Sequence, residues 1–295
     1  MRVTKLYFEG NTTYTIVVKK AMVKGVPLFM KKRLPIFVIG FLLIIPFHAL
    51  SVSGAKKDEG VKIPDSVLNI TKENTYPNPT QDLPKLQPSE LTDELLNSAK
   101  VKIENPNLIR MLNETNVNST PFAFGYRAVI YLGQWPLNYE STETAPNWEY
   151  QKINTNYFDN RGGKSNYQIH YVQEAQKVIK GGLTAKIPEA EDVKKMMILK
   201  AAEKSGLPLA FETVVGAGTK KDQVYNIPPK RLGYLYGYAP AVNEKGKVTY
   251  GEVYLMLKGN KKMIIVKNVT SQGIGAWIPL QDYVTFGFVA SERPR

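Results

Sequence analysis

Hydrophobic and polar residues alternate with a period of two over most of the chain beyond Pro121. This alternation is typical of strands, in which successive side chains point to opposite faces. It predicts strands over residues 122–132, 148–157, 167–179, 183–187, 209–215, 232–238, 248–257, 263–269 and 283–289. Residues 258–262, with the sequence KGNKK, are expected to form the loop of a hairpin between two of these strands.

Three segments have the helical period instead. Ser89 and Asn105 suit N-cap positions before short apolar stripes, and Pro106 suits the first helical position. One main helix is predicted over residues 189–205, because acidic residues open it and Gly206 follows it. Many hairpins with one central helix indicate a β-rich α+β fold with antiparallel, sandwich-like sheets, one main helix and short N-terminal helices, rather than a parallel βαβ fold.

A continuous apolar run lies near the N terminus. Lys31, Lys32 and Arg33 precede apolar residues 34–50, and small residues end in Ala55. This pattern predicts a signal peptide over residues 30–55. An uncleaved membrane anchor is the alternative, although a run of about 17 residues is at the lower limit for a spanning helix. Both interpretations predict an extracytoplasmic protein, secreted or associated with the cell envelope.

The remaining segments define the expected domain organisation. Residues 24–26 (KGV) can be encoded by a purine-rich ribosome-binding sequence shortly before Met30, so we interpret residues 1–29 as upstream sequence translated from a misassigned start. Residues 56–88 contain five prolines and are expected to form an extended arm that links the domain to the membrane side or lies over it. Residues 89–295 are expected to form a single β-rich domain, or two closely packed lobes.

The amino-acid composition limits the classes of partner that the chain could bind. The full chain carries a net charge of +13, but residues 1–55 hold eight of its 39 cations and one of its 26 anions, which leaves +6. This mild charge suits loose attraction to an anionic wall polymer, peptidoglycan or a membrane surface, and lacks the clustered basic footprint of a nucleic-acid binder. The chain has no cysteine, which excludes disulfides and a lipid-modified cysteine and favours a Gram-positive bacterium.

The residues available for catalysis are few. Beyond residue 55 the chain has one histidine, His170, and no cysteine, so thiol catalysis, Cys-zinc sites and His-cluster metal sites are excluded. We expect no cofactor and no metal. Residues 216–221 (GAGTKK) lack the spacing of a phosphate-binding loop and no helix is predicted after them, so a hairpin turn is expected.

The loop 159–164 (DNRGGK) has the composition of a binding site. Arg161 and Lys164 could bind an anionic group, with Asp159 orienting the arginine; the alternative is a tight turn with a surface ion pair. His170 follows on a strand and is expected to point opposite Ile169 and its other neighbour, Tyr171. Convergence of Asp159, Arg161 and His170 in one pocket would produce a metal-independent hydrolase.

The aromatic residues indicate a second candidate surface. Tyr234, Tyr236 and Tyr238 share one face of a predicted strand, with Gly233 and Gly237 on the other. A tyrosine row can stack sugar rings or peptides. The alternative is that another layer packs on the glycine side while the tyrosines line the rim of the core.

Four segments carry a family resemblance: NITKENTYPNPTQDLPKLQPSELT, VKIENPNLIRMLNETNVNSTPFAFGYRA, YQKINTNYFDNRGGKSNYQIHYVQEAQK and GYLYGYAPAVNEKGKVTYGEVYLMLKGNKK. The chain resembles the YfkD-like family of Bacillus and its relatives over residues 61–295. The resemblance implies an exported bacterial protein of a spore-forming group, and it implies neither a reaction nor any catalytic or binding residue.

The sequence as a whole favours a non-enzymatic binding or structural module near the wall or the membrane surface. One alternative is the hydrolase with a site near Asp159, Arg161 and His170. Another is a folding or assembly factor for exported proteins, which would need an exposed apolar groove.

Overall fold

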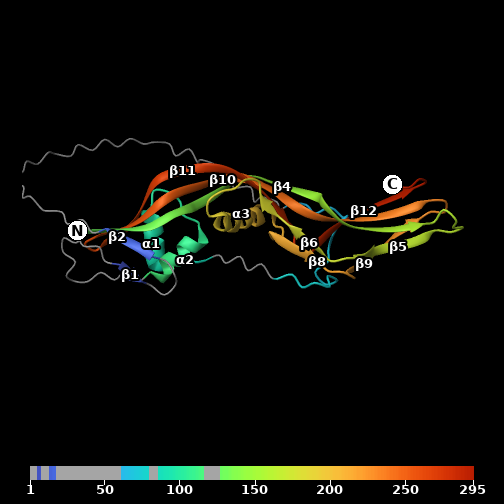
Figure 1. Cartoon of the computed structure of the whole chain (residues 1–295), viewed down its shortest axis with the longest axis horizontal. Helices are drawn as coiled ribbons and strands as arrows, with labels where there is room; N and C mark the ends of the chain where they lie inside the picture. The colour runs from blue at the N-terminus through green and yellow to red at the C-terminus, as the bar shows by residue number, and fades with distance from the viewer. Residues whose placement is uncertain (1–4, 8–12, 18–60, 80–85, 116–126) are drawn as a thin grey trace, which may run out of the picture.

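The computed structural model describes residues 5–7, 13–17, 61–79, 86–115 and 127–295 (Figure 1). The elements, in chain order, are β1 Lys5–Tyr7, β2 Thr13–Val17, β3 Val67–Asn69, α1 Glu90–Ser98, α2 Pro106–Glu114, β4 Arg127–Asp159, β5 Tyr167–Val172, β6 Lys177–Lys180, β7 Gly182–Leu183, α3 Ala190–Ser205, β8 Glu212–Val215, β9 Lys220–Ile227, β10 Leu232–Lys258, β11 Lys261–Pro279 and β12 Tyr283–Ser291. All strand pairings among them are antiparallel, and the predicted β-rich α+β class is confirmed.

The strand β10 is the centre of the main sheet. It pairs with β4 along its whole length, from Leu232 opposite Asp159 to Lys258 opposite Arg127. Its other edge is shared by β12, which covers residues 232–238, and β11, which covers most of the remainder. Because an extended residue advances about 3.3 Å, the 33 residues of β4 give the sheet a length of roughly 100 Å. Figure 1 shows the resulting rod.

The long strands correct the shorter ones predicted from the sequence. Residues 148–157 lie within β4, and both 232–238 and 248–257 lie within β10. Pro136 and Pro146 lie within β4, although proline cannot donate a ladder hydrogen bond. They are tolerated because the outer edge of β4 is largely unpaired in the described residues, where β2 meets it only at Val129 and Ile130.

Two further differences concern the short strands. The predicted strand 167–179 is divided into β5, which pairs with β9, and β6, which pairs with β8. Between them, the Gln173 side-chain amide donates to the carbonyls of Ile153 and Ala175. The strand β9 was missed because its sequence, KKDQVYNI, is mostly polar. The predicted hairpin loop is confirmed as a two-residue turn in which Gly259 has a φ of +57°.

The helices begin and end where their caps predict. The Ser89 side chain accepts a hydrogen bond from the backbone N–H of Thr92, and the Asn105 side chain accepts from Asn107 and Leu108. The helix α3 ends at Gly206, which has the left-handed φ of +69° that favours glycine.

Three hydrophobic clusters follow one another along the main sheet. The first lies under α1 and α2, the second under α3, and the third under the paired strands β5–β9 and β6–β8. In Figure 1 these covering elements lie along one side of the long strands. The register of β10 shifts at Ala239/Ala241 and at Tyr250/Glu252. At each shift the alternating pattern of buried side chains along β10 moves by one residue, so the apolar face stays toward the covering layer.

The described part of the N-terminal arm, residues 61–79, lies on the domain. Its strand β3 pairs with β12. The Asn78 side chain accepts from the N–H of Val214 at 2.8 Å and donates to the carbonyl of the same residue at 2.9 Å, so an amide side chain takes the place of a strand at the edge of β8. Asn78 and Asn74 also both donate to the Asp282 carboxylate.

The predicted signal segment, residues 30–55, lies outside the described residues and stays a prediction. The predicted upstream sequence contains β1 and β2, which pair with each other. Within the ranges that the structure describes, no helix is both long and apolar enough to cross a bilayer.

A buried polar network joins α2 to α3. Asn105 is fully buried, and its amide nitrogen donates to the carbonyl of Pro136 at 2.8 Å and to the Asp192 carboxylate at 2.9 Å. Asn107 donates to the other oxygen of the same carboxylate. Every hydrogen-bonding position of the Asn105 amide is therefore used, which fixes the start of both helices against β4.

The substitution Asn105→Asp is expected to lower the free energy of unfolding by about 2–4 kcal/mol, because it replaces a donor with a second carboxylate beside the buried Asp192. Urea unfolding at pH 7 measures the change. The matched control is Asn97→Asp on α1, where the amide donates to Asp93 at 3.0 Å in exposed surroundings. It should cost less than about 1 kcal/mol. Equal losses in the two variants would contradict the role of burial.

A second buried polar group lies under α3. The Glu244 side chain is fully buried and accepts hydrogen bonds from the Tyr139 hydroxyl at 3.0 Å and the Thr144 hydroxyl at 2.6 Å. Burial and the neighbouring Glu244 carboxyl raise the pKa of Tyr139 well above its ordinary value.

This raised pKa predicts a loss of stability in alkali. Above pH about 10 the unfolded chain releases the Tyr139 proton while the folded chain retains it, so stability falls by up to about 1.4 kcal/mol per pH unit. Tyr139→Phe should remove this part of the pH dependence and, at pH 7, cost about 1–3 kcal/mol because Glu244 loses a donor. Urea unfolding at pH 7 and 10.5 tests both effects, with Tyr76→Phe as an exposed control. An unchanged alkaline slope in Tyr139→Phe would refute the assignment.

Candidate binding surface

The tyrosine row lies at one end of the rod. Tyr234, Tyr236 and Tyr238 follow one another on β10, with ring centroids 6.1 and 6.2 Å apart. Tyr157 of β4 lies directly opposite Tyr234, and the two ring centroids are 5.1 Å apart. Four tyrosines from two neighbouring strands therefore form one continuous aromatic surface, here called the tyrosine face.

The glycines determine which side of the sheet is covered. The β5–β9 pair packs on the face opposite the tyrosines, and a Cβ atom built on Gly237 would lie 2.6 Å from the Tyr171 ring. A Cβ on Gly233 would lie 2.2 Å from the Ile227 side chain. The second layer thus occupies the glycine side, as the alternative interpretation expected, and no described layer covers the tyrosine side. Tyr157 is 51% exposed, whereas Tyr234 is 9% exposed between its neighbours.

Charged groups border the tyrosine face. The Lys152 ammonium lies 5.0 Å from the centre of the Tyr236 ring. Partial desolvation, the Asp159 carboxylate and Tyr234 raise the pKa of Tyr157, while Arg161 acts in the opposite direction. Arg161, a predicted binding residue, therefore belongs to the surroundings of the predicted tyrosines.

The loop that holds Arg161 is built around Asn160. The buried Asn160 side chain donates to the carbonyls of Ser165 and Ile227, which closes the turn. The Arg161 guanidinium forms an exposed ion pair with Asp159 at 2.7 Å. Hydrogen bonds from the Arg161 guanidinium and from its backbone N–H hold the pKa of Asp159 below its ordinary value. Lys164 is exposed on the same loop.

Within the described residues, His170 is not bonded to the Asp159–Arg161 ion pair. It is exposed on β5 opposite Val224, and its neighbours Ile169 and Tyr171 are buried, so it points away from them as the alternation predicted. In the described part of the chain, no hydrogen bond or ion pair joins His170 to Asp159 or Arg161. The same part contains no cluster of three or more His, Asp or Glu side chains that could hold a metal ion.

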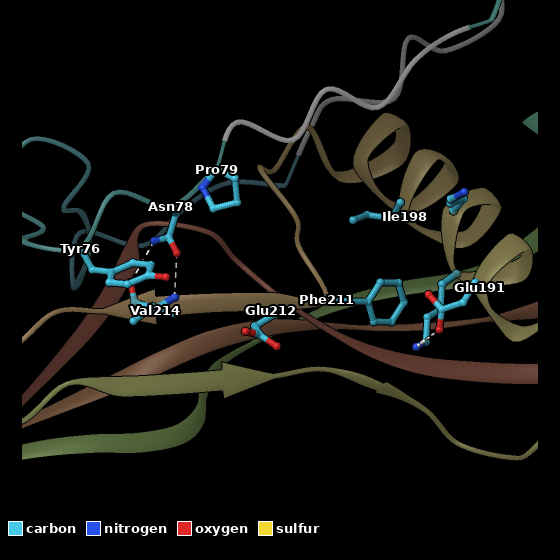
Figure 2. A pocket seen from close by; sticks show the side chains of 10 residues that line it. Tyr76, Asn78, Pro79, Glu191, Ile198, Phe211, Glu212 and Val214 are labelled. Atoms are coloured by element: carbon cyan, nitrogen blue, oxygen red, sulfur yellow. Dashed lines mark hydrogen bonds and ion pairs between the residues drawn. The ribbon is translucent and has the colours of Figure 1, made fainter.

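A pocket of about 360 Å³ lies near the middle of the rod (Figure 2). Three segments line it: the arm (Tyr76, Asn78, Pro79), α3 (Glu191, Lys194, Lys195, Ile198) and the residues at β8 (Phe211, Glu212, Val214). Lys194 forms an ion pair with Glu191 at 2.7 Å and lies over the Phe211 ring. Sequence reasoning missed this pocket because no motif connects the arm to α3 and β8, which lie more than a hundred residues further along the chain.

The glycine-rich segment 216–221 is a turn, although it does not join a hairpin. It connects β8 to β9, which pair with β6 and β5 respectively, and Gly218 has a φ of +82°. A strand follows it, so there is no helix N-terminus to hold a phosphate group.

Residues 64–295 match the model of a family described as YfkD-like protein. The chain belongs to the YfkD-like family. It is 63% identical over 266 residues to "Uncharacterized protein YfkD" from Bacillus subtilis (strain 168), an alignment that covers 90% of this chain and all of the relative. No solved structure matches the chain. The resemblance inferred from the sequence is thereby confirmed, and it assigns no reaction to the YfkD-like fold.

The close packing behind the tyrosine face predicts an asymmetry between two glycines of this YfkD-like chain. Gly237→Ala should lower the free energy of unfolding by about 1–3 kcal/mol, because its Cβ would overlap the Tyr171 ring. Gly287→Ala, on the neighbouring strand, should be close to neutral, since its Cβ would lie 3.6 Å from the Tyr238 ring, an ordinary contact. Thermal unfolding of both variants measures the difference, and a neutral Gly237→Ala would contradict the packing.

Proposed function

We propose that this chain is a non-enzymatic binding module of the cell envelope whose tyrosine face holds a glycan strand of the wall. The observation that carries the proposal is the row of four tyrosines, with Tyr157 exposed, Tyr236 and Tyr238 half-buried and Tyr234 buried, on a sheet whose other face is packed. The predicted signal segment at residues 30–55 supports an extracytoplasmic location, where such polymers are found.

The chemistry of the tyrosine face suits a sugar chain. Aromatic rings pack against the apolar faces of sugar rings, and phenol hydroxyls can exchange hydrogen bonds with sugar hydroxyls. Lys152, above Tyr236, and Arg161, near Tyr157, add cations that suit the anionic substituents of wall polymers. Few charged side chains lie on the tyrosine face itself, so the stacking of sugar rings on the tyrosines is the main source of affinity.

The row is also held in place before any ligand arrives. Tyr236 lies on the central strand, which is paired on both sides at this point with β4 and β12. The Tyr234 hydroxyl accepts a hydrogen bond from the backbone N–H of Arg295 at 3.1 Å, which anchors the C-terminal residues beside the row. A ligand that binds ordered side chains pays less conformational entropy.

The hydrolase alternative has weaker support. The Asp159 carboxylate and the Arg161 guanidinium are exposed and bonded to each other, and neither is joined to His170. A general base needs its substrate proton within hydrogen-bond reach, in a site that holds the substrate. The folding-factor alternative needs an apolar groove, and the pocket of Figure 2 has two glutamates and two lysines in its walls.

Retention on purified wall glycan tests the proposal. The double substitution of Tyr157 and Tyr236 by alanine should weaken binding by about 10- to 30-fold, since each aromatic contact contributes roughly 1 kcal/mol. Lys152→Glu should weaken binding to glycan that carries anionic polymer, and high salt should reduce that effect.

The matched control is Tyr131→Ala at the far end of β4. Tyr131 is 40% exposed and its ring centroid lies 5.1 Å from that of Tyr254. It therefore resembles Tyr157, which is 51% exposed and has the same 5.1 Å ring separation from Tyr234, but it lies outside the tyrosine face. Thermal unfolding confirms that each variant is folded. Equal retention of the wild type and the Tyr157/Tyr236 double variant at low salt would remove the proposal.

A further inference from the structure

The opposite end of the rod has an exposed surface of different chemistry. Three neighbouring strands meet there: the start of β4, the end of β10 and the start of β11 (Figure 1). Residues that lie opposite one another in adjacent strands point to the same face, so the register assigns the side chains of this end to rows across the sheet.

The outermost row is cationic. Arg127, Lys258 and Lys261 lie opposite one another beside the β10–β11 turn, and all three are exposed. The next row on the same face is Val129, Met256 and Met263. The third row is Tyr131, Tyr254 and Ile265.

The two inner rows form an exposed apolar patch. Val129 is 43% and Tyr131 is 40% exposed, and the other four side chains are half-buried. The helices α1 and α2 pack against the other face, where Leu255 and Ile264 are buried, so no described layer covers the patch. Scattered apolar residues on a surface need no explanation, but contiguous ones mark an interaction site.

The charges around the patch are unequal. The cationic row lies on one side, and Lys267 lies over the Tyr254 ring at 5.1 Å on the other. Among the described residues at this end of the three strands, the carboxylate on this face belongs to Glu252, which accepts a hydrogen bond from the Tyr254 hydroxyl at 2.6 Å. The acidic residues of α1 (Glu90, Asp93 and Glu94) belong to the covered side of the sheet.

We propose that these three rows, called the tip surface, bind the surface of an anionic lipid bilayer. Lysine and arginine beside apolar and tyrosine side chains suit the interface of a membrane, where the cations meet lipid phosphates and the apolar groups enter the acyl boundary. Each lysine near an anionic surface raises partitioning about fivefold. A second copy of the chain is a poorer occupant, because it presents the same excess of cations.

The tip surface and the tyrosine face are independent. They differ in chemistry, since the tip surface combines its two tyrosines with valine, methionine and isoleucine, which have no ring face on which a sugar can stack. Tyr131 and Tyr157 are separated along β4 by roughly 80 Å of extended chain. The failure of glycan binding would leave the membrane proposal unaffected.

A single fluorescent label tests the proposal in the full chain, which has no natural cysteine to compete. Met263→Cys carries an environment-sensitive dye in the tip surface, and Thr249→Cys carries the same dye on β10 as the control. The probe is a vesicle of phosphatidylcholine with or without about one third phosphatidylglycerol. The dye reports on its own surroundings, and the dye at position 249 controls for vesicle binding elsewhere on the chain.

The dye at position 263 should shift to shorter wavelength on vesicles with phosphatidylglycerol, and the dye at 249 should not. Reversal of Lys258 and Lys261 to glutamate should weaken the response about 30-fold or more, and high salt should reduce it. An absent shift, or an equal shift on neutral vesicles, would overturn the proposal. A short-wavelength emission of the dye at position 263 before vesicles are added would also overturn the proposal. If that emission depended on protein concentration, the occupant would be a second copy of the chain. If it did not, the occupant would be the chain's own residues.

Discussion

The pairing of β4 with β10 is the interaction on which the rest of the structure depends. It joins residues 127–159 to residues 232–258 through one continuous antiparallel ladder, and β11 and β12 then extend the sheet from the free edge of β10. The three hydrophobic clusters each need this sheet as their floor, because none of the helices or short strand pairs has enough apolar surface to fold alone. The molecule is a rod because β4 and β10 each run in one direction over their whole length.

Sequence reasoning recovered the local elements better than their continuity. The caps at Ser89 and Asn105 and the end of α3 at Gly206 follow from side-chain and backbone chemistry within a few residues, so the sequence predicts them well. The full length of β4 does not follow, because the tolerance of Pro136 and Pro146 depends on which edge of the strand remains unpaired. The tyrosine row could be predicted from alternation, whereas its exposure depends on the β5–β9 pair lying behind it. The pocket beside Phe211 needed the three-dimensional fold, because its walls are distant in sequence.

The two candidate surfaces have a common origin in the architecture. Among the described residues, helices and short strand pairs lie along one side of the sheet (Figure 1), and the chemistry of the other side varies with position. Tyrosines gather at one end and a cationic row with aliphatic residues at the other, while the middle of β10 presents Lys245 and Lys247. A single-layer sheet of this length offers separate sites without separate domains.

The continuity of β4 also has a mechanical consequence. Tyr131 and Tyr157 belong to the same strand, so a force applied between the two ends of the rod runs along the covalent backbone of β4 instead of across its hydrogen bonds. The neighbouring ladder keeps that strand extended and prevents it from coiling. Tension therefore meets a chain that is already nearly at full length, and the rod would act as a stiff tether that transmits load with little stretch.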